Sequence, residues 1–262
     1  MILFNNQPID NSEFSEDILN HGLSIYEVCR VFRGKVIFLD DNLARLANSI
    51  KKSGIELDLS ALRVGEKLDH LIQLEHIKEG NIKYVLRLTS AGMDEYIYQI
   101  PHSYPREEAY EEGVDTATFR AMRQNAEVKY INTDLREATN AIMREKNVYE
   151  VLLVDNDGCL TEGSRSNTFF IKDNTLYTAP LPYVLPGTSR KRVLTLCQEN
   201  RIPVIEEKVH LDELPHFDAA FITGTSPLVL PIRRIDTLHF DPRHPLLRQV
   251  MESYFHLLEH HT

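Results

Sequence analysis

Strand-like and helix-like patterns follow one another in an irregular order along these 262 residues, and this order most limits the fold. Runs rich in β-branched and aromatic residues at 25–31, 83–89 and 219–223 predict strands. Apolar residues at helical spacing before Gly54 predict a helix, and residues 187–200 predict another. A regular alternation of strands and helices would indicate a doubly wound parallel sheet. The irregular order favours an α+β fold instead.

Composition and charge exclude several classes of protein. The chain is 42% hydrophobic and 26% charged, as is ordinary for a globular protein, and its net charge of −10 argues against nucleic-acid binding. Three scattered cysteines give neither a disulfide framework nor a metal motif, so we expect no metal site. The N-terminus is too polar for a signal peptide, and no apolar run approaches the length of a membrane span. We therefore expect a cytoplasmic protein that binds neither nucleic acid nor membrane.

A polar, acidic stretch at residues 105–113 marks a change in composition. We expect it to link two lobes, because the chain is long enough for two modest domains. The predicted division is a small N-terminal α/β domain, 1–112, and a larger C-terminal domain, 113–262.

A single lysine, Lys129, lies in the apolar run 127–131, which predicts a strand. A lysine that faces a pocket can lose its proton through desolvation and then attack an aldehyde. The alternative is a lysine on the solvent face of a half-buried strand, with its stem covering apolar surface.

Two further charged residues suit a ligand that carries both a phosphate and a basic nitrogen. Arg45 lies on the first predicted helix, and its guanidinium can donate to a phosphate as a fork. Glu162 precedes a turn that ends at Asn167. The alternatives are an ion pair between Arg45 and Asp41 one helical turn earlier, and a surface glutamate in a plain turn.

Two Gly/Ser/Thr turns offer seats for a phosphate. Gly187, Thr188 and Ser189 open a predicted helix, where free N–H groups and the positive end of the helix dipole favour an anion. Thr225 and Ser226 follow a predicted strand and offer hydroxyls beside closely approachable backbone. The alternatives are ordinary helix capping at the first turn and a simple reversal at the second.

The order of these segments resembles a known family. The segments are DNLARL (41–46), VKYIN (128–132), TEGSRSN (161–167), LPGTSR (185–190) and TGTS (223–226). They are similar to fold-type IV pyridoxal-phosphate enzymes, the group of branched-chain aminotransferases, D-amino-acid aminotransferases and aminodeoxychorismate lyases. The resemblance implies a two-lobed α+β fold like that of D-amino-acid aminotransferase. It also implies a homodimer with pyridoxal 5′-phosphate between the lobes of each subunit.

The resemblance also implies roles for individual residues. The lysine of the family's K-x-x-N segment binds the cofactor, and Lys129 matches it. The carboxylate of the E-G-x-x-x-N segment keeps the ring nitrogen of the cofactor protonated, and Glu162 matches it, with Ser166 and Asn167 in the same cofactor-binding turn. Arg45 matches the arginine of the H-L-x-R-L helix. The two turns described above resemble the cofactor-phosphate loops.

Four residues match the substrate side of the family less closely. Tyr26 and Arg30 resemble an F-E-x-x-R strand, with tyrosine in place of phenylalanine. The stretch after Arg87 lacks the R-G ending of many members, and Thr133 stands where transaminases often have tyrosine. These positions shape substrate choice in the family, so the amino donor is left open.

Three functions follow from the resemblance. The leading one is a pyridoxal-phosphate-dependent aminotransferase that moves an amino group between an amino acid and a 2-oxo acid, similar to branched-chain aminotransferases. The second is an aminodeoxychorismate lyase, which eliminates pyruvate to give 4-aminobenzoate. The third is a non-catalytic dimeric binding protein of the same fold, and the presence of both Lys129 and Glu162 argues against it.

Overall fold

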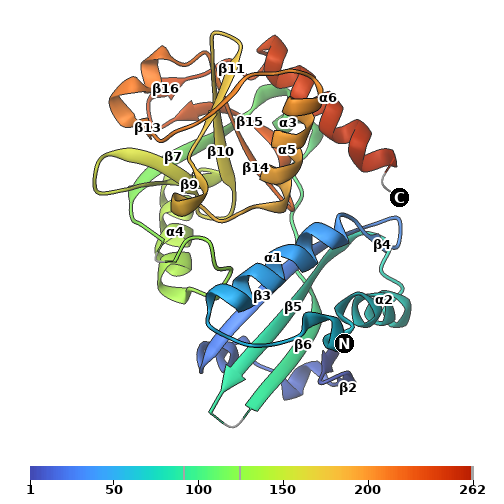
Figure 1. The fold of residues 1–262 in the computed structure, drawn as a ribbon. Helices are drawn as coiled ribbons and strands as arrows, with labels where there is room; N and C mark the ends of the chain where they lie inside the picture. Colours follow the sequence, from blue (N-terminus) through green and yellow to red (C-terminus); the bar gives the residue numbers. More distant parts are fainter. Residues whose placement is uncertain (91, 124, 261–262) are drawn as a thin grey trace. The chain divides into compact units, whose positions relative to one another are not determined.

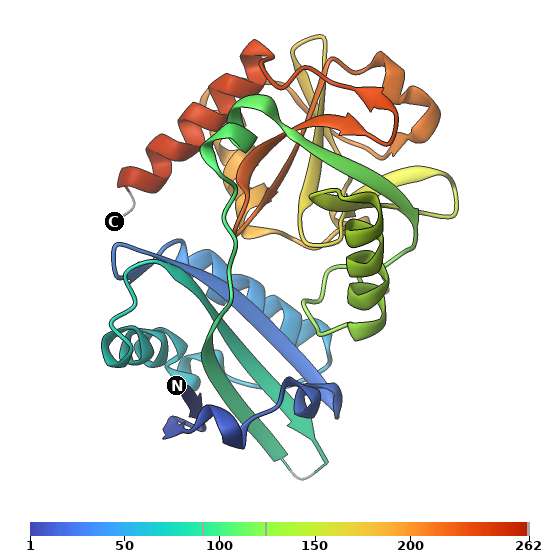
Figure 2. The same ribbon diagram turned by 180° about the vertical axis from the view of Figure 1, so that it is seen from behind.

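A computed structural model of the protein describes residues 1–90, 92–123 and 125–260, which form two compact units. The first contains Met1–Ser103, Val128–Asn132 and residue 260. The second contains Tyr104–Glu127 and Thr133–Glu259. In Figures 1 and 2 the first unit is mostly blue to teal and the second mostly green to red.

The first unit is built on an antiparallel six-stranded sheet, in the order β2-β1-β6-β5-β3-β4. The strands are β1 (Ile2–Phe4), β2 (Gln7–Ile9), β3 (Leu23–Phe32), β4 (Lys35–Val36), β5 (Gly80–Thr89) and β6 (Gly92–Ile100). The helices are α1 (Leu39–Lys52), α2 (Val64–Leu74) and the short 3-10 turns η1 (Asn11–Glu13), η2 (Glu16–Asn20) and η3 (Leu59–Leu62). The strands predicted at 25–31 and 83–89 are confirmed as parts of β3 and β5.

The core of the first unit lies between β3 and α1. Alternate residues of a strand point to opposite faces of its sheet. Ile25 and Cys29 of β3 therefore share one face, where they pack with Leu46 and Ile50 of α1. Tyr26 belongs to the cluster on the other face. Burying an aliphatic side chain such as Leu46 contributes roughly 1.5–3 kcal/mol.

Charges at both ends stabilise helix α1. Asp40 and Asp41 lie in its first turn, and Lys51 and Lys52 lie in its last turn. Each pair faces the end of the helix dipole that attracts it. Together with the apolar stripe, these charges explain why a helix forms here. The helix predicted before Gly54 is thereby confirmed.

The strand predicted at 127–131 is wrong. Tyr130 forms one isolated bridge to Ile25, and Lys129 O accepts a hydrogen bond from Tyr26 N–H at 3.0 Å. The N–H groups of Lys129 and Tyr130 donate to Ser49 Oγ and to Val128 O instead of to β3, so no continuous ladder forms. A run of apolar residues is not enough to form a strand where its backbone groups are bonded elsewhere.

The second unit holds a mixed ten-stranded sheet in the order β12-β11-β10-β14-β15-β7-β8-β9-β13, with β16 paired to β15. The strands are β7 (Val114–Arg120), β8 (Glu150–Val154), β9 (Cys159–Gly163), β10 (Asn167–Lys172), β11 (Thr175–Thr178), β12 (Val204–Glu206), β13 (Val209–His210), β14 (Ala219–Gly224), β15 (Leu228–Ile235) and β16 (Leu238–His239). The helices are α3 (Glu107–Glu112), α4 (Thr133–Lys146), α5 (Thr188–Glu199), α6 (Pro245–His260) and the turns η4 (Leu181–Tyr183) and η5 (Leu211–His216).

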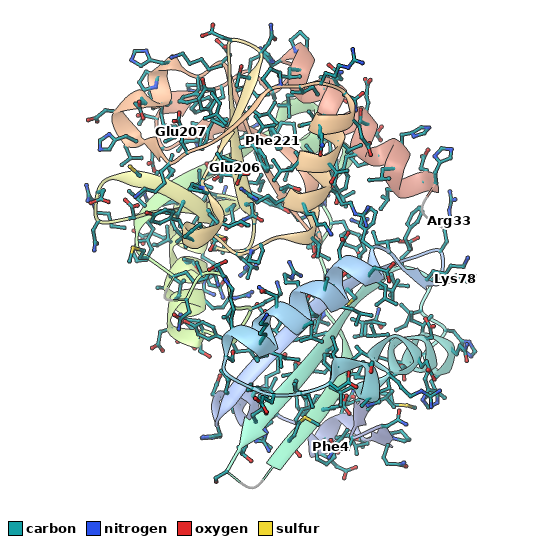
Figure 3. The ribbon with its side chains drawn as sticks, viewed as in Figure 1. Phe4, Arg33, Lys78, Glu206, Glu207 and Phe221 are labelled. Carbon is teal, nitrogen blue, oxygen red and sulfur yellow. The ribbon has the colours of Figure 1, made fainter. Side chains whose placement is uncertain are left out.

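The paired strands β10 and β14 lie in the interior of this sheet. Phe221, which Figure 3 labels, is the register partner of Phe169. Both side chains are fully buried, and their rings stack with centroids 4.9 Å apart. β14 confirms the strand predicted at 219–223. α5 contacts β14 and confirms the helix predicted at 187–200, with Gly187 as its N-cap.

Residues near the acidic stretch belong to the second unit, because α3 contacts β15. The first stretch of the first unit thus ends at Ser103, before the boundary placed at 112, and Val128–Asn132 returns to this unit. Antiparallel and mixed sheets with irregularly placed helices make the fold α+β, as predicted. Of the helices in the described ranges, none is both long and apolar enough to cross a membrane.

Candidate active site

Lys129 is half-buried in the first unit, and hydrogen bonds of its main-chain N–H and C=O groups hold it in place. Its N–H donates to Ser49 Oγ on α1 at 3.2 Å, and its carbonyl accepts from Tyr26 N–H at 3.0 Å. Its Nζ lies 5.0 Å from the centroid of the Tyr26 ring. The structure therefore brings together Lys129 and Tyr26, two residues predicted for the cofactor and the substrate.

Arg45 is buried and forms an ion pair with Glu27 of β3 instead of the predicted alternative partner, Asp41. Arg45 Nε and Nη2 donate to the two carboxylate oxygens at 2.9 and 2.6 Å, and Asn42 Nδ2 donates to Oε2 at 2.9 Å. Burial alone lowers the pKa of Arg45, but Glu27 more than offsets this and raises it. Because removal of Arg45 would leave Glu27 buried and unpaired, an Arg45→Ala variant tests fold stability as much as phosphate binding.

Glu162 is a buried carboxylate that three donors hold in one orientation. Arg123 Nε donates to Oε1 at 2.7 Å. Leu185 N–H donates to Oε2 at 2.9 Å, and Asn167 Nδ2 lies 3.5 Å from the same oxygen. Asn167 Nδ2 also donates to Leu185 O at 3.0 Å. Two predicted segments, the Glu162–Asn167 turn and the chain before α5, are thus joined around one charge.

A second buried carboxylate, Glu150, fixes the turn that follows Glu162 by accepting hydrogen bonds from it. Ser164 Oγ and Ser166 Oγ donate to Glu150 at 2.7 and 2.9 Å, and Arg165 N–H donates at 3.2 Å. Gly163 must lack a side chain, because a Cβ there would collide with Ser166 Oγ. The Ser166 hydroxyl, predicted for the cofactor, therefore serves the turn itself.

The start of α5 has the features of an anion seat. Within the described part of the chain, no side chain caps this helix, and Thr188 and Ser189 in its first turn are buried. Gly187 packs against Asn167, because a Cβ on Gly187 would overlap Asn167 Oδ1. Helix N–H groups without a capping side chain attract a phosphate group.

The second predicted phosphate turn begins on the strand beside this seat. Thr223 is the register partner of Asn167 in the β10–β14 pair. Its Oγ1 is buried and has no hydrogen-bond partner among the residues that the structure describes. A buried hydroxyl without a partner is costly unless a ligand or water completes it. Thr225 and Ser226, which follow, are half-buried. The second unit thus fits the predicted cofactor, with a fixed carboxylate beside an uncapped helix start.

The positions of the other predicted substrate residues, Arg30, Arg87 and Thr133, indicate less about substrate binding. Arg87 uses Nε and Nη2 on Asp94, at 3.2 and 2.5 Å, and Nη1 on Ile18 O at 3.1 Å. Its guanidinium is therefore occupied by protein groups. Arg30 lies on β3 and is half-buried, and Thr133 is the first residue of α4.

Four residues that contact the predicted residues within one unit or the other were not predicted from the sequence, namely Glu27, Ser49, Arg123 and Glu150. Glu27 could have been predicted from the sequence, because it lies inside the segment that resembles F-E-x-x-R. The other three act through partners far along the chain or from a loop without any motif, so no local pattern marks them.

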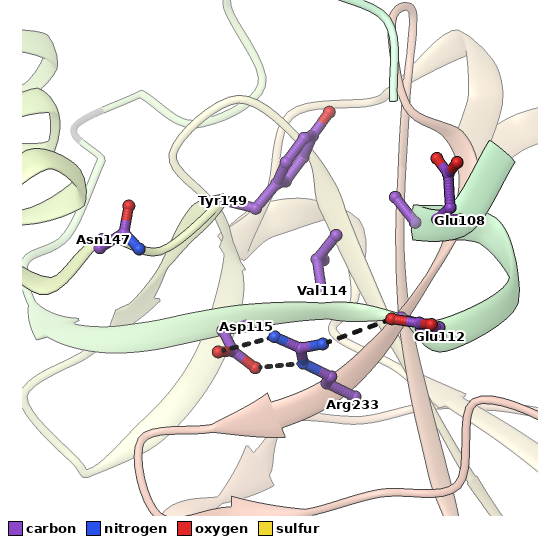
Figure 4. A pocket seen from close by; sticks show the side chains of 9 residues that line it. Glu108, Glu112, Val114, Asp115, Asn147, Tyr149 and Arg233 are labelled. Atoms are coloured by element: carbon purple, nitrogen blue, oxygen red, sulfur yellow. Dashed lines mark hydrogen bonds and ion pairs between the residues drawn. The ribbon is translucent and has the colours of Figure 1, made fainter. Parts of the chain in front are cut away.

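A hollow of about 300 Å³ in the second unit is lined by other residues (Figure 4). Its lining residues, all within the described ranges, include none that was predicted for cofactor or substrate. Arg233 Nε donates to Asp115 Oδ1 at 2.7 Å across it, and this bond holds the pKa of the Asp115 carboxyl below its usual range. The hollow is therefore no part of the candidate site.

Comparison with known proteins places the chain among related enzymes. Residues 24–235 match the family described as amino-transferase class IV. The D-alanine aminotransferase of Bacillus licheniformis is 31% identical over 253 residues, which cover 90% of this chain and 88% of that protein.

Solved structures share the fold. The branched-chain aminotransferase of the thermophilic archaeon Thermoproteus uzoniensis, solved with norvaline, superposes with a TM-score of 0.86 at 22% identity, covering 98% of this chain and 94% of that one. The 4-amino-4-deoxychorismate lyase of Pseudomonas aeruginosa gives a TM-score of 0.84 at 21% identity, covering 99% of both chains. The predicted fold type is thereby confirmed.

The pair formed by Arg123 and Glu162 leads to a prediction about stability. Their side chains are 14% and 2% exposed, so Arg123→Met leaves a buried carboxylate without its guanidinium. We expect Arg123→Met to lower the free energy of unfolding by about 3–5 kcal/mol in urea denaturation. The double variant Arg123→Met/Glu162→Leu should recover part of that loss. Arg63→Met, whose pair with Glu66 is exposed, is the control and should change nothing measurable. Equal stability of Arg123→Met and the control would contradict this account of the pair.

Proposed function

Because this chain belongs to the class IV amino-transferase family, we propose that it transfers an amino group between an amino acid and a 2-oxo acid with pyridoxal 5′-phosphate as cofactor. One observation carries the proposal. The second unit holds a buried carboxylate, Glu162, in a fixed orientation and joins it to the uncapped start of α5. A cofactor with a basic ring nitrogen and a phosphate needs both groups at a fixed separation.

The proposed assignment of residues follows from this chemistry. Glu162 would face the ring nitrogen, and the first turn of α5 would receive the phosphate, together with Thr225 and Ser226. Arg45 would add a donor, because Glu27 occupies only the Nε–Nη2 edge of its guanidinium. Lys129 would hold the cofactor through Nζ. When bound, pyridoxal phosphate supplies an electron sink for the carbanion at the substrate Cα.

Lys129 has a second task in this proposal. With the cofactor bound, its Nζ would take the proton from the substrate Cα and would deliver it to C4′ of the cofactor. That task requires a lysine whose main chain stays in place while its side-chain amine moves. Two backbone hydrogen bonds hold the main chain of Lys129, and the Tyr26 ring lies beside its Nζ.

The first relative described above guides the choice of substrate. That protein is named a D-alanine aminotransferase, so D-alanine with 2-oxoglutarate is the first pair to assay. The second candidate, aminodeoxychorismate lyase, is favoured by the P. aeruginosa structure that this chain matches along nearly its whole length. The family resemblance also supports a homodimer located in the cytoplasm, and these remain parts of the proposal.

A panel of substrates tests the proposed function. D-alanine, L-alanine and L-leucine are each offered with pyruvate or 2-oxoglutarate, and aminodeoxychorismate is offered alone. We expect amino-group transfer that requires both an amino donor and a 2-oxo acid. Release of pyruvate and 4-aminobenzoate from aminodeoxychorismate, with no transfer in the other assays, would replace the proposal with the lyase. No turnover at all would favour the binding protein.

Glu162→Gln separates catalysis from cofactor binding. A neutral amide cannot keep the ring nitrogen protonated, and that charge matters most when the carbanion forms. We expect the variant to bind pyridoxal phosphate but to lose about 2–4 kcal/mol of transition-state stabilisation, roughly 30- to 900-fold in kcat. Glu207→Gln, which changes an exposed glutamate elsewhere in the second unit (Figure 3), is the control and should keep full turnover. Wild-type kcat in folded Glu162→Gln would show that Glu162 is only a turn residue.

A further inference from the structure

Ser49 is a fully buried hydroxyl on α1 that the proposed chemistry does not use. Its Oγ accepts the N–H of Lys129 at 3.2 Å across 80 residues of sequence. Lys129 O is already bonded to Tyr26 N–H on the edge of β3. The peptide groups on both sides of the Lys129 Cα are therefore fixed, one to a strand and the other to a helix.

The surrounding backbone shows why a side chain is needed at this position. Residues 128–132 form one isolated bridge to β3 and no continuous ladder. The strand takes up Lys129 O, so the N–H has to find its acceptor elsewhere. A backbone N–H without a partner inside a protein is rare because it is costly. The hydroxyl oxygen of Ser49 on α1 accepts the hydrogen bond from this N–H.

The position of Ser49 on its helix adds a second constraint. Arg45 and Ser49 are four residues apart, so they lie on the same face of α1, about 6 Å apart along its axis. Arg45 is itself locked to Glu27 of β3 by two hydrogen bonds. One helical turn thus fixes both the arginine assigned to the phosphate and the backbone of the lysine.

We propose that Ser49 is a positioning residue that sets the direction of the Lys129 side chain relative to Arg45. The inference rests on the proposed role of Lys129. Ser49 touches neither the substrate nor the reacting atoms in this account, and it acts only through the Lys129 peptide. A small change in the direction of a catalytic group is enough to slow a reaction strongly, because reacting atoms must be aligned.

Three variants of the complete holoenzyme test the inference. Ser49→Ala removes the acceptor, and Ser49→Cys keeps a side chain of similar size but offers only a weak acceptor. Ser53→Ala is the matched control, because Ser53 also makes a hydrogen bond on α1, from its Oγ to Ser49 O at 2.8 Å, without contacting Lys129. Each variant is measured for kcat and for the pH midpoint at which the visible absorption of the bound cofactor titrates.

We expect Ser49→Ala and Ser49→Cys to move the pH midpoint by at least about half a unit and to lower kcat on the order of tenfold. Ser53→Ala should match the wild type in both. A Ser49→Cys variant equal to the wild type would overturn the inference, because packing volume alone would then suffice. So would equal effects of Ser49→Ala and Ser53→Ala, which would indicate a general weakening of α1.

The same experiment separates this inference from the proposed function. If the wild-type protein shows no visible absorption with pyridoxal phosphate, the proposed function itself fails. If the wild type absorbs and both Ser49 variants keep its pH midpoint and its kcat, only the role of Ser49 fails.

Discussion

The candidate site residues of the second unit depend on one buried charge, the carboxylate of Glu162. It lies almost without solvent contact, and an ionised group in such a place needs several donors. Arg123, Leu185 N–H and Asn167 supply them from three separate stretches of chain. Satisfying Glu162 therefore folds the turn after β9 against the start of α5. Local stability and the catalytic orientation that we propose for Glu162 would come from the same contacts.

The first unit uses a similar principle with different groups. A buried ion pair between Arg45 and Glu27 joins α1 to β3, and a hydroxyl on the same helix holds the backbone of Lys129. In both units a side chain to which we assign a role in the proposed function lies on a segment that several polar contacts hold in place. Such contacts are valuable for function because they fix direction, whereas apolar packing alone leaves more freedom.

Local patterns predicted what depends on local physics. The apolar stripe and end charges that form α1 are written in fourteen consecutive residues, and the motifs around Lys129 and Glu162 are equally compact. Arg123, by contrast, meets its carboxylate 39 residues further on, and Ser49 meets its partner after 80. No periodicity encodes such pairs. The run at 127–131 failed as a strand for the same reason, since the Lys129 N–H bonds to Ser49 on a distant helix instead of to β3.

The central claim is that Lys129 carries pyridoxal phosphate, and peptide mapping tests it most directly. Sodium borohydride fixes the cofactor permanently to the lysine that holds it, so digestion and mass spectrometry identify that residue. Lys83 is a demanding internal comparison, because its Nζ lies 5.5 Å from the centroid of the same Tyr26 ring. We expect the pyridoxyl group on Lys129 and none on Lys83. A label on Lys83, or on any other lysine in place of Lys129, would contradict the account.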